Sequence, residues 1–163
     1  MIFTEELMNP IFDILENCRG VEQMDEHHPE GDVFTHSLQC YWWACRESKD
    51  TDLILAALLH DVGKAVISKG HEKEGLGLLD DLVSAKTLWL IQHHMRFWAY
   101  ILGEMKKLSK CLYLADSPWL PELAQLARWD KLARSPKKKV KYDREEIMER
   151  LNNIGMSRFK REE

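Results

Sequence analysis

Paired cysteines, long apolar runs and strand-like alternation are all missing from this 163-residue sequence. The four cysteines form no CxxC pair, which argues against a zinc ribbon or a disulfide framework and favours reduced thiols. No uncharged apolar run reaches the roughly 18 residues of a membrane span. The acidic start MIFTEELMNP also lacks the apolar core of a signal peptide. We therefore expect a soluble, cytoplasmic protein without a membrane partner.

Charge of one sign is also not in large excess, since the net charge is −4. This balance gives no general argument for binding nucleic acid or membrane. The distribution is uneven, because residues 131–163 hold eleven Lys or Arg against six Asp or Glu, which leaves −9 on the first 130 residues. A chain of this length suits one domain. We expect a single domain over residues 1–163, with a basic C-terminal extension over residues 135–163.

The apolar residues recur at helical spacing, and the sequence has no Asn-Gly or Asp-Gly hairpin signal. This pattern predicts an all-α bundle of about six to eight helices. Thr51 is the predicted N-cap of the third helix. The expected helices cover about residues 2–18, 33–47, 51–60, 75–83, 84–95, 104–114, 121–133 and 143–151.

The stretch LLHDVGK joins a core helix to a polar group. Residues 53–59 are all apolar, and His60 and Asp61 follow them directly. A buried imidazole and carboxylate are costly unless they are paired, and both are ligands of zinc, iron, nickel and manganese. Gly63 predicts a tight turn, and Lys64 returns a positive charge to the same place. The end of this helix is therefore a candidate metal site.

Other metal-seeking side chains also lie on or beside apolar helices. Helical bundles build metal sites from side chains on facing helices. We therefore expect several of these residues to converge. They are His36, His71, His93, His94 and Asp130.

These residues carry a resemblance. The order of His36, His60-Asp61 and Asp130 matches the H…HD…D pattern of the HD-domain metal-dependent phosphohydrolase superfamily. The segments HHPEGDVFTHSL, LLHDVGK, QHHMR and LAQLARWDKLAR resemble those of the HD domain of bacterial tRNA nucleotidyltransferases, over about residues 23–134. The resemblance implies an HD-type helical bundle. No strand-rich part with paired catalytic aspartates precedes it, so we expect a stand-alone hydrolytic module and no CCA addition.

The resemblance also implies one or two divalent metal ions. Mn, Ni, Fe, Zn, Co and Mg are not distinguished by such ligands. The implied ligands of the first ion are His36, His60, Asp61 and Asp130. The implied ligands of the second are Asp61, His71 and His94. Asp61 is then also a catalytic residue because it would bridge two ions, and Lys64 and Arg96 would offset charge on a phosphate.

The implied reaction is hydrolysis of a phosphoester, as a phosphodiesterase or phosphatase. The expected substrate is a nucleotide or an RNA-terminal phosphate, with a 2′,3′-cyclic phosphodiester or a 2′-phosphate as specific candidates. The run from Lys137 to Lys141 is either a solvated surface or a contact to RNA phosphates. An HD-type mixed-valent di-iron oxygenase, as in inositol oxygenase, is the first alternative. A non-catalytic nucleotide-binding regulator is the second.

Three polar residues stay open between two interpretations. Asp32 is either an N-cap or a contact to a third metal or a substrate hydroxyl. Asp116 either caps the following helix or replaces Asp130 as the last ligand. His93 is either a capping group or a substrate group, since adjacent helical residues point about 100° apart and seldom serve one ion equally.

Overall fold

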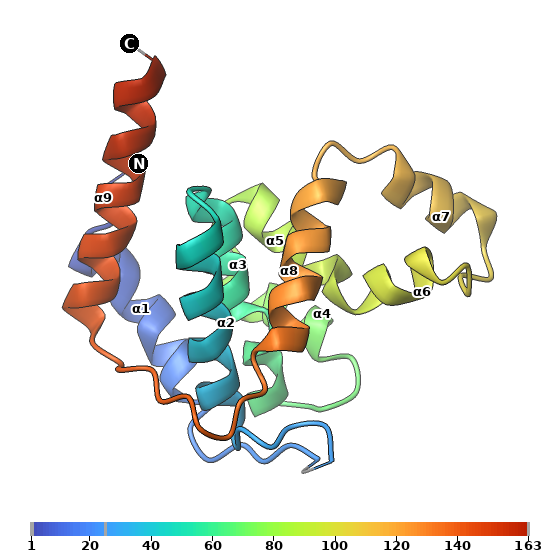
Figure 1. Cartoon of the computed structure of the whole chain (residues 1–163), viewed down its shortest axis with the longest axis horizontal. Helices are drawn as coiled ribbons and strands as arrows, with labels where there is room; N and C mark the ends of the chain where they lie inside the picture. Colours follow the sequence, from blue (N-terminus) through green and yellow to red (C-terminus); the bar gives the residue numbers. More distant parts are fainter. Residues whose placement is uncertain (1, 25, 163) are drawn as a thin grey trace.

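The computed structural model describes residues 2–24 and 26–162, with side chains up to residue 155. Regular structure in these residues is entirely helical, which confirms the all-α prediction (Figure 1). The α-helices are α1 (Glu5–Glu16), α2 (Val33–Glu47), α3 (Thr51–Leu59), α4 (His71–Leu79), α5 (Ala85–His93), α6 (Phe97–Ile101), α7 (Leu108–Ala115), α8 (Leu120–Leu132) and α9 (Arg144–Glu162). Two 3-10 turns, η1 (Val62–Ala65) and η2 (His94–Arg96), follow α3 and α5.

Helix α3 is the centre of the core. Every residue from Leu53 to Leu59 is buried, as expected for a helix that is apolar on all sides. Helices α2, α5 and α8 pack around it (Figure 1). Because α3 is enclosed along its whole length, the chain that leaves its last turn is still inside the bundle.

The C-terminal helix packs against the start of the chain. The side chain of Asn152 in α9 accepts a hydrogen bond from the Phe3 amide at 2.7 Å and donates one to the Phe3 carbonyl at 3.0 Å. Arg144, at the start of α9, forms an ion pair with Asp13 of α1 at 2.8 Å. These contacts place α9 beside α1, on the side of the bundle opposite to α7 (Figure 1).

Helices α6 and α7 project away from the bundle as an arm (Figure 1). The prediction of one helix over residues 104–114 was wrong in this region, because α6 was missed and α7 begins only at Leu108. Gly103 ends α6 with a φ of 69°, a left-handed conformation that glycine adopts readily. Large apolar side chains, including Ile101, Leu102 and Leu108, are exposed on this arm.

Several helix ends also differ from the predictions. The side chain of Asp50, and not that of Thr51, caps α3 by accepting hydrogen bonds from the next two exposed amides. Helix α4 begins at His71 and ends before Asp81, whose φ of 64° is incompatible with a continued helix. Helix α9 continues well past residue 151.

No helix in the described part of the chain has both the length and the apolar character that crossing a bilayer requires.

Candidate metal centre

The structure brings all six predicted metal-site residues into one buried cluster. Each lies near the end of a helix or a 3-10 turn, so that α2, α3, α4, α5 and α8 all contribute to it. The exposed fractions are 0% for His36, 0% for His60, 2% for Asp61, 3% for His71 and 2% for His94, and 20% for the side chain of Asp130. Residues from five helices thus converge at the end of α3.

Asp61 lies between two pairs of histidines. Its Oδ2 is 3.2 Å from Nε2 of His60 and 3.6 Å from Nε2 of His36. Its Oδ1 is 3.0 Å from Nε2 of His71 and 3.4 Å from Nε2 of His94. One carboxylate therefore presents a separate oxygen to each pair.

Asp130 closes the first of these two groups. Its Oδ1 is 2.9 Å from Nε2 of His36 and 3.5 Å from Nε2 of His60. Typical zinc–nitrogen and zinc–oxygen bonds add up to about 4.1 Å. The separations within the cluster are all shorter than this sum, so a single ion could contact the atoms of each group. The residues present therefore fit a divalent metal.

The imidazole rings are oriented by main-chain carbonyl groups. Each Nδ1 lies within hydrogen-bond distance of one carbonyl oxygen: Ala133 for His36 (2.8 Å), Ala57 for His60 (2.9 Å), Ser68 for His71 (3.0 Å) and Ile91 for His94 (2.6 Å). A neutral ring that donates from Nδ1 has its free lone pair on Nε2, the usual arrangement of a metal-binding histidine. Four Nε2 atoms are thereby aimed at the two carboxylates.

Nε2 of His60 has the clearest need of a further partner. It is fully buried and has no hydrogen-bond partner among the described residues. Leaving such an atom unsatisfied costs about 1–3 kcal/mol. A metal ion would remove that penalty, which is an independent sign that the cluster fits one.

The electrostatics of the metal-free cluster point the same way. Burial would raise the pKa of Asp61, but His60, with further hydrogen bonds from His71 and His94, holds that pKa well below its usual range. Burial would lower the pKa of His60, yet Asp61 and its neighbours hold it well above the ordinary value. Protons thus stabilise the cluster when no metal is present, and metal ligation would have to displace them.

Two further residues of the cluster escaped the sequence analysis. Oε1 of Glu30 is 3.0 Å from Nδ1 of His36, on the ring edge that faces away from the centre, and 2.8 Å from Nδ1 of His28. Sγ of Cys40 is 3.8 Å from Nε2 of His36. The spacing of four residues between His36 and Cys40 on a helix could have revealed the second contact. Nothing in the spacing of Glu30 indicated the first.

Lys64 lies beside the cluster. Its Nζ is 3.2 Å from Oδ2 of Asp61 and 3.1 Å from Oε1 of Gln23. It also lines a cavity with Gln23, His27 and His28. An ammonium group in this position can meet a ligand that enters from the cavity.

Arg96 lies elsewhere. Its side chain is exposed and lines a second cavity with His93, Lys110 and Tyr113. His93 is buried there between Trp89 and Tyr113, with ring-centroid distances of 4.7 and 5.5 Å. Burial, with the nearby Arg96, lowers the pKa of His93 to about 4. The side chain of His93 caps no described helix, and the expected contact between Arg96 and phosphate stays a prediction.

The structure separates the two open aspartates. Asp32 is the N-cap of α2 and accepts a hydrogen bond from the Thr35 amide at 2.8 Å, as the capping interpretation predicted. The capping prediction for Asp116 was wrong, because this residue ends α7 and no described side chain caps α8. The Ser117 hydroxyl takes up the Trp119 amide there. Asp130, and not Asp116, reaches the histidines.

Gly63 has a different purpose from the predicted tight turn. Its φ is not in the left-handed region, so the turn itself does not require glycine. A Cβ at this position would lie 1.9 Å from the His71 carbonyl oxygen and 2.8 Å from the Gly75 amide nitrogen. Glycine therefore allows α4 to approach η1, which brings His71 to Asp61.

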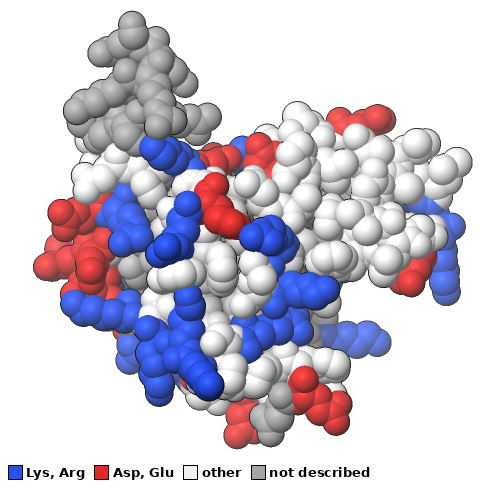
Figure 2. Space-filling view, in the orientation of Figure 1, with Lys and Arg blue, Asp and Glu red and all other residues white. Residues whose placement is uncertain are grey.

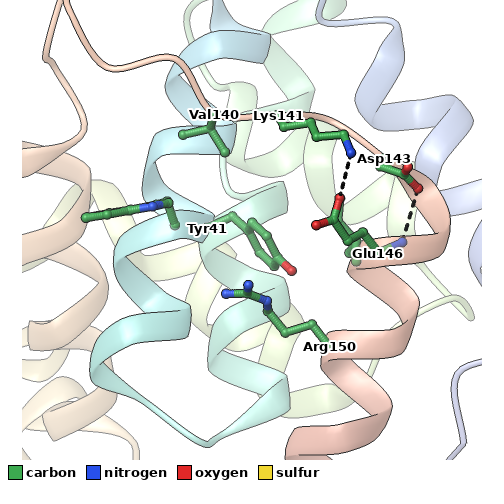
Figure 3. A pocket seen from close by; sticks show the side chains of 8 residues that line it. Tyr41, Val140, Lys141, Asp143, Glu146 and Arg150 are labelled. Carbon is green, nitrogen blue, oxygen red and sulfur yellow. Dashed lines mark hydrogen bonds and ion pairs between the residues drawn. The ribbon is translucent and has the colours of Figure 1, made fainter.

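Another cavity lies between α2 and the start of α9 (Figure 3). Tyr41 and Arg150 point into it from the two helices, and Lys141 pairs with Glu146 at 3.5 Å along its edge. None of the six metal-site residues lines this cavity. The cluster is therefore a separate feature of the bundle.

Comparison with known proteins agrees with this geometry. The model of the HD domain family matches residues 33–135, well over half of the chain. The Multifunctional CCA protein of Teredinibacter turnerae is 39% identical over 70 residues, which cover 39% of this chain and 17% of that protein. Those of Methylococcus capsulatus and Hahella chejuensis are each 39% identical, over 79 and 85 residues, covering 44% and 49% of this chain.

The chain spans about a fifth or less of the length of these curated relatives. The family match itself contains His36, the His60-Asp61 pair and Asp130. These residues meet at one point in an all-α bundle. The chain belongs to the HD domain family.

Proposed function

We propose that this protein is a metal-dependent phosphoester hydrolase. The observation that carries the proposal is the position of Asp61, whose two oxygens face separate pairs of imidazole Nε2 atoms. Two-metal phosphatases and nucleases place their ions about 3.5–4 Å apart and share ligands between them. A carboxylate with one oxygen in each half of the cluster is suited to that arrangement.

The proposed ligands of a first ion are His36, His60, Asp61 and Asp130. Those of a second are Asp61, His71 and His94. Divalent ions in these positions would polarise a phosphoryl oxygen and lower the pKa of a bound water toward neutrality. Imidazole and carboxylate ligands accept several metals, including Mn, Ni, Fe, Zn and Co.

The chain's own groups contribute binding and orientation. Asp61 serves both halves of the cluster and so fixes their spacing. Lys64 stands 3.2 Å from Oδ2 of Asp61 and opens onto the cavity with Gln23 and His28. Its ammonium group can bind a phosphate oxygen and offset charge that develops during hydrolysis. We place the phosphate of the substrate between Lys64 and the cluster.

A nucleotide or an RNA-terminal phosphate is the proposed substrate, with a 2′,3′-cyclic phosphodiester or a 2′-phosphate as the first candidates. The relatives named Multifunctional CCA protein support a substrate of this class. Basic side chains also gather over the lower part of the face in Figure 2, where Figure 1 shows the segment joining α8 to α9. Lys137, Lys139 and Lys141 of this segment are exposed. A polyanion is thus a plausible ligand on electrostatic grounds.

Elemental analysis coupled to a phosphoester panel tests the proposal. Protein purified without chelators should contain a divalent metal and hydrolyse at least one of these phosphoesters. Asp61→Ala should lose most of the metal and the activity while remaining helical by circular dichroism. Asp116→Ala removes an exposed carboxylate and should keep both. Stoichiometric metal in Asp61→Ala would refute the site, and oxygen consumption with two irons would instead favour the oxygenase alternative.

Salt dependence tests the RNA end separately. A polymer that binds the basic segment releases counterions, whereas a mononucleotide releases few. Activity on an RNA end should therefore fall more steeply with added salt than activity on a mononucleotide. Replacing Lys137, Lys138 and Lys139 by Gln should remove that difference. An equal salt dependence of both substrates in the unaltered protein would favour a small nucleotide.

A further inference from the structure

One polar atom of the first half of the cluster has no part in the proposed hydrolysis. Cys40 lies one turn after His36 on α2, and the exposed fractions of both residues are 0%. Its Sγ is 3.8 Å from Nε2 of His36. That nitrogen is the ring atom aimed at the carboxylates, so the sulfur lies at the metal-facing edge of the ring and not behind it.

The sulfur shares a small space with three other potential ligands. His36, Cys40, His60 and Asp130 each offer one ligand atom, and these four atoms all lie within 4.8 Å of one another. Typical zinc–sulfur and zinc–nitrogen bonds add up to about 4.4 Å, which exceeds the 3.8 Å between Sγ and Nε2 of His36. An ion held by this histidine could therefore also contact the sulfur.

A second, independent observation concerns the same space. Nε2 of His60 is fully buried and has no hydrogen-bond partner among the described residues. It belongs to the same four-atom group as Sγ of Cys40. An unsatisfied imidazole nitrogen and a buried thiol are thus turned to one point, together with the carboxylate of Asp130.

We propose that Cys40 is a further ligand of the first metal ion, a thiolate added to the histidines and aspartates. This inference rests on the proposed metal centre. When the ion binds, one metal–sulfur bond forms and the thiol proton is lost to solvent, so that the sulfur enters as an anion. No oxidant or other reactant is required.

The consequence of a thiolate ligand is metal selection. Soft thiolate favours zinc and similar transition metals, whereas sites made only of carboxylate, carbonyl and water suit magnesium, calcium and manganese. A site of two imidazoles, carboxylates and one thiolate should discriminate strongly against magnesium. The identity of residue 40 would then decide which ion the centre holds, while the residues shared with the HD pattern decide that it holds one.

Cys18 offers a matched control. It is also fully buried and free, but its Sγ lies 3.9 Å from the Val62 carbonyl oxygen, in the apolar core. It belongs to none of the potential metal groups among the described residues. Cys18→Ser and Cys40→Ser make the same chemical change at two buried sites, and only the second should alter the metal.

Cobalt titration of the full chain tests the inference. Cobalt bound by a thiolate absorbs in the near ultraviolet through sulfur-to-metal charge transfer, in addition to the weaker visible bands of any protein-bound cobalt. The unaltered protein and Cys18→Ser should show the charge-transfer band. Cys40→Ser should keep the visible bands, lose the charge-transfer band and bind zinc at least about tenfold more weakly, a loss at the lower end of that seen for disturbed metal sites.

The failures of the two proposals are distinguishable. Visible cobalt bands without charge transfer in the unaltered protein, or a charge-transfer band that survives in Cys40→Ser, would overturn the role of Cys40 and leave the metal centre intact. No cobalt binding by equilibrium dialysis would overturn the metal centre as well. If Cys40→Ser does not fold, the cadmium NMR spectrum of the unaltered protein decides, because a thiolate ligand moves the cadmium resonance strongly downfield.

Discussion

Replacement of Gly63 by Ala tests how the two halves of the cluster are held together. The new Cβ would lie 1.9 Å from the His71 carbonyl oxygen and 2.8 Å from the Gly75 amide nitrogen. Carbon and oxygen atoms that are not bonded need about 3 Å or more, so α4 must retreat by roughly 1 Å. Both obstacles are backbone atoms, and no flexible side chain can give way instead.

The expected penalty is at or above the upper end of that for overpacking, which is about 1–3 kcal/mol. For a chain of this size, 1 kcal/mol corresponds to about 2–4 °C in melting temperature. The melting temperature of Gly63→Ala should therefore fall by about 6 °C or more. His71 should also move away from Oδ1 of Asp61, now 3.0 Å from its Nε2, so that the second ion is lost before the first.

Gly77→Ala is the matched control. Gly77 is an exposed residue of α4, and a Cβ there would meet nothing within 4 Å among the described atoms. Alanine in a helix is favoured over glycine by about 0.5–1 kcal/mol, so this variant should melt slightly above the unaltered protein. Calorimetry and metal analysis of the two variants give the answer. A Gly63→Ala protein that melts like the unaltered one and keeps all of its metal would refute the reasoning.

Three further predictions concern the cluster and its surroundings. Asp130→Asn should remove bound metal and hydrolysis, whereas Asp116→Asn should change the free energy of unfolding by no more than about 0.5 kcal/mol, as for other exposed positions; the opposite pattern in metal analysis and melting would reverse the assignment. Burial lowers the pKa of His60 but Asp61 holds it well above its usual value, so its stabilisation is complete below the unfolded pKa of about 6.5 and is lost as pH rises. The melting temperature of metal-free protein in chelator should therefore fall between about pH 7 and about pH 8, and a constant or rising value would contradict this. Glu30→Gln should weaken zinc binding about tenfold or more in chelator competition, as expected when the partner of a ligand is altered, and unchanged affinity would show that Glu30 does not support the site.

The centre of the bundle and the membership of the cluster were accessible from the sequence. An apolar run that is too uniform for a surface helix had to be buried, and a His-Asp pair at its end had to find partners. The other members of the cluster were expected from their positions on apolar helices and from the HD resemblance. Local pattern was enough for these features because each depends on one helix and its end.

The parts that were missed depend on contacts between distant segments or on weak local signals. The division of the two Asp61 oxygens between histidine pairs follows from the approach of α4 at Gly63, which no periodicity encodes. Glu30 reaches His36 from a loop, and Asp116 was displaced as a cap because α8 begins later than Ser117-Pro118 suggested. Helix α6 is only five residues long, too short to leave a periodic signal.

The carbonyl groups that orient the rings also determine how the site tolerates genetic change. His60, His71 and His94 each use the carbonyl of the residue three positions earlier, Ala57, Ser68 or Ile91. Every amino acid carries that carbonyl, so codon changes at those three positions leave the tautomer and direction of the rings in place as long as the chain keeps its path. His36 differs, because Ala133 and Glu30 must be brought to it from elsewhere in the chain. Random mutation should therefore disable the site by misdirecting His36 far more often than by misdirecting the other three rings.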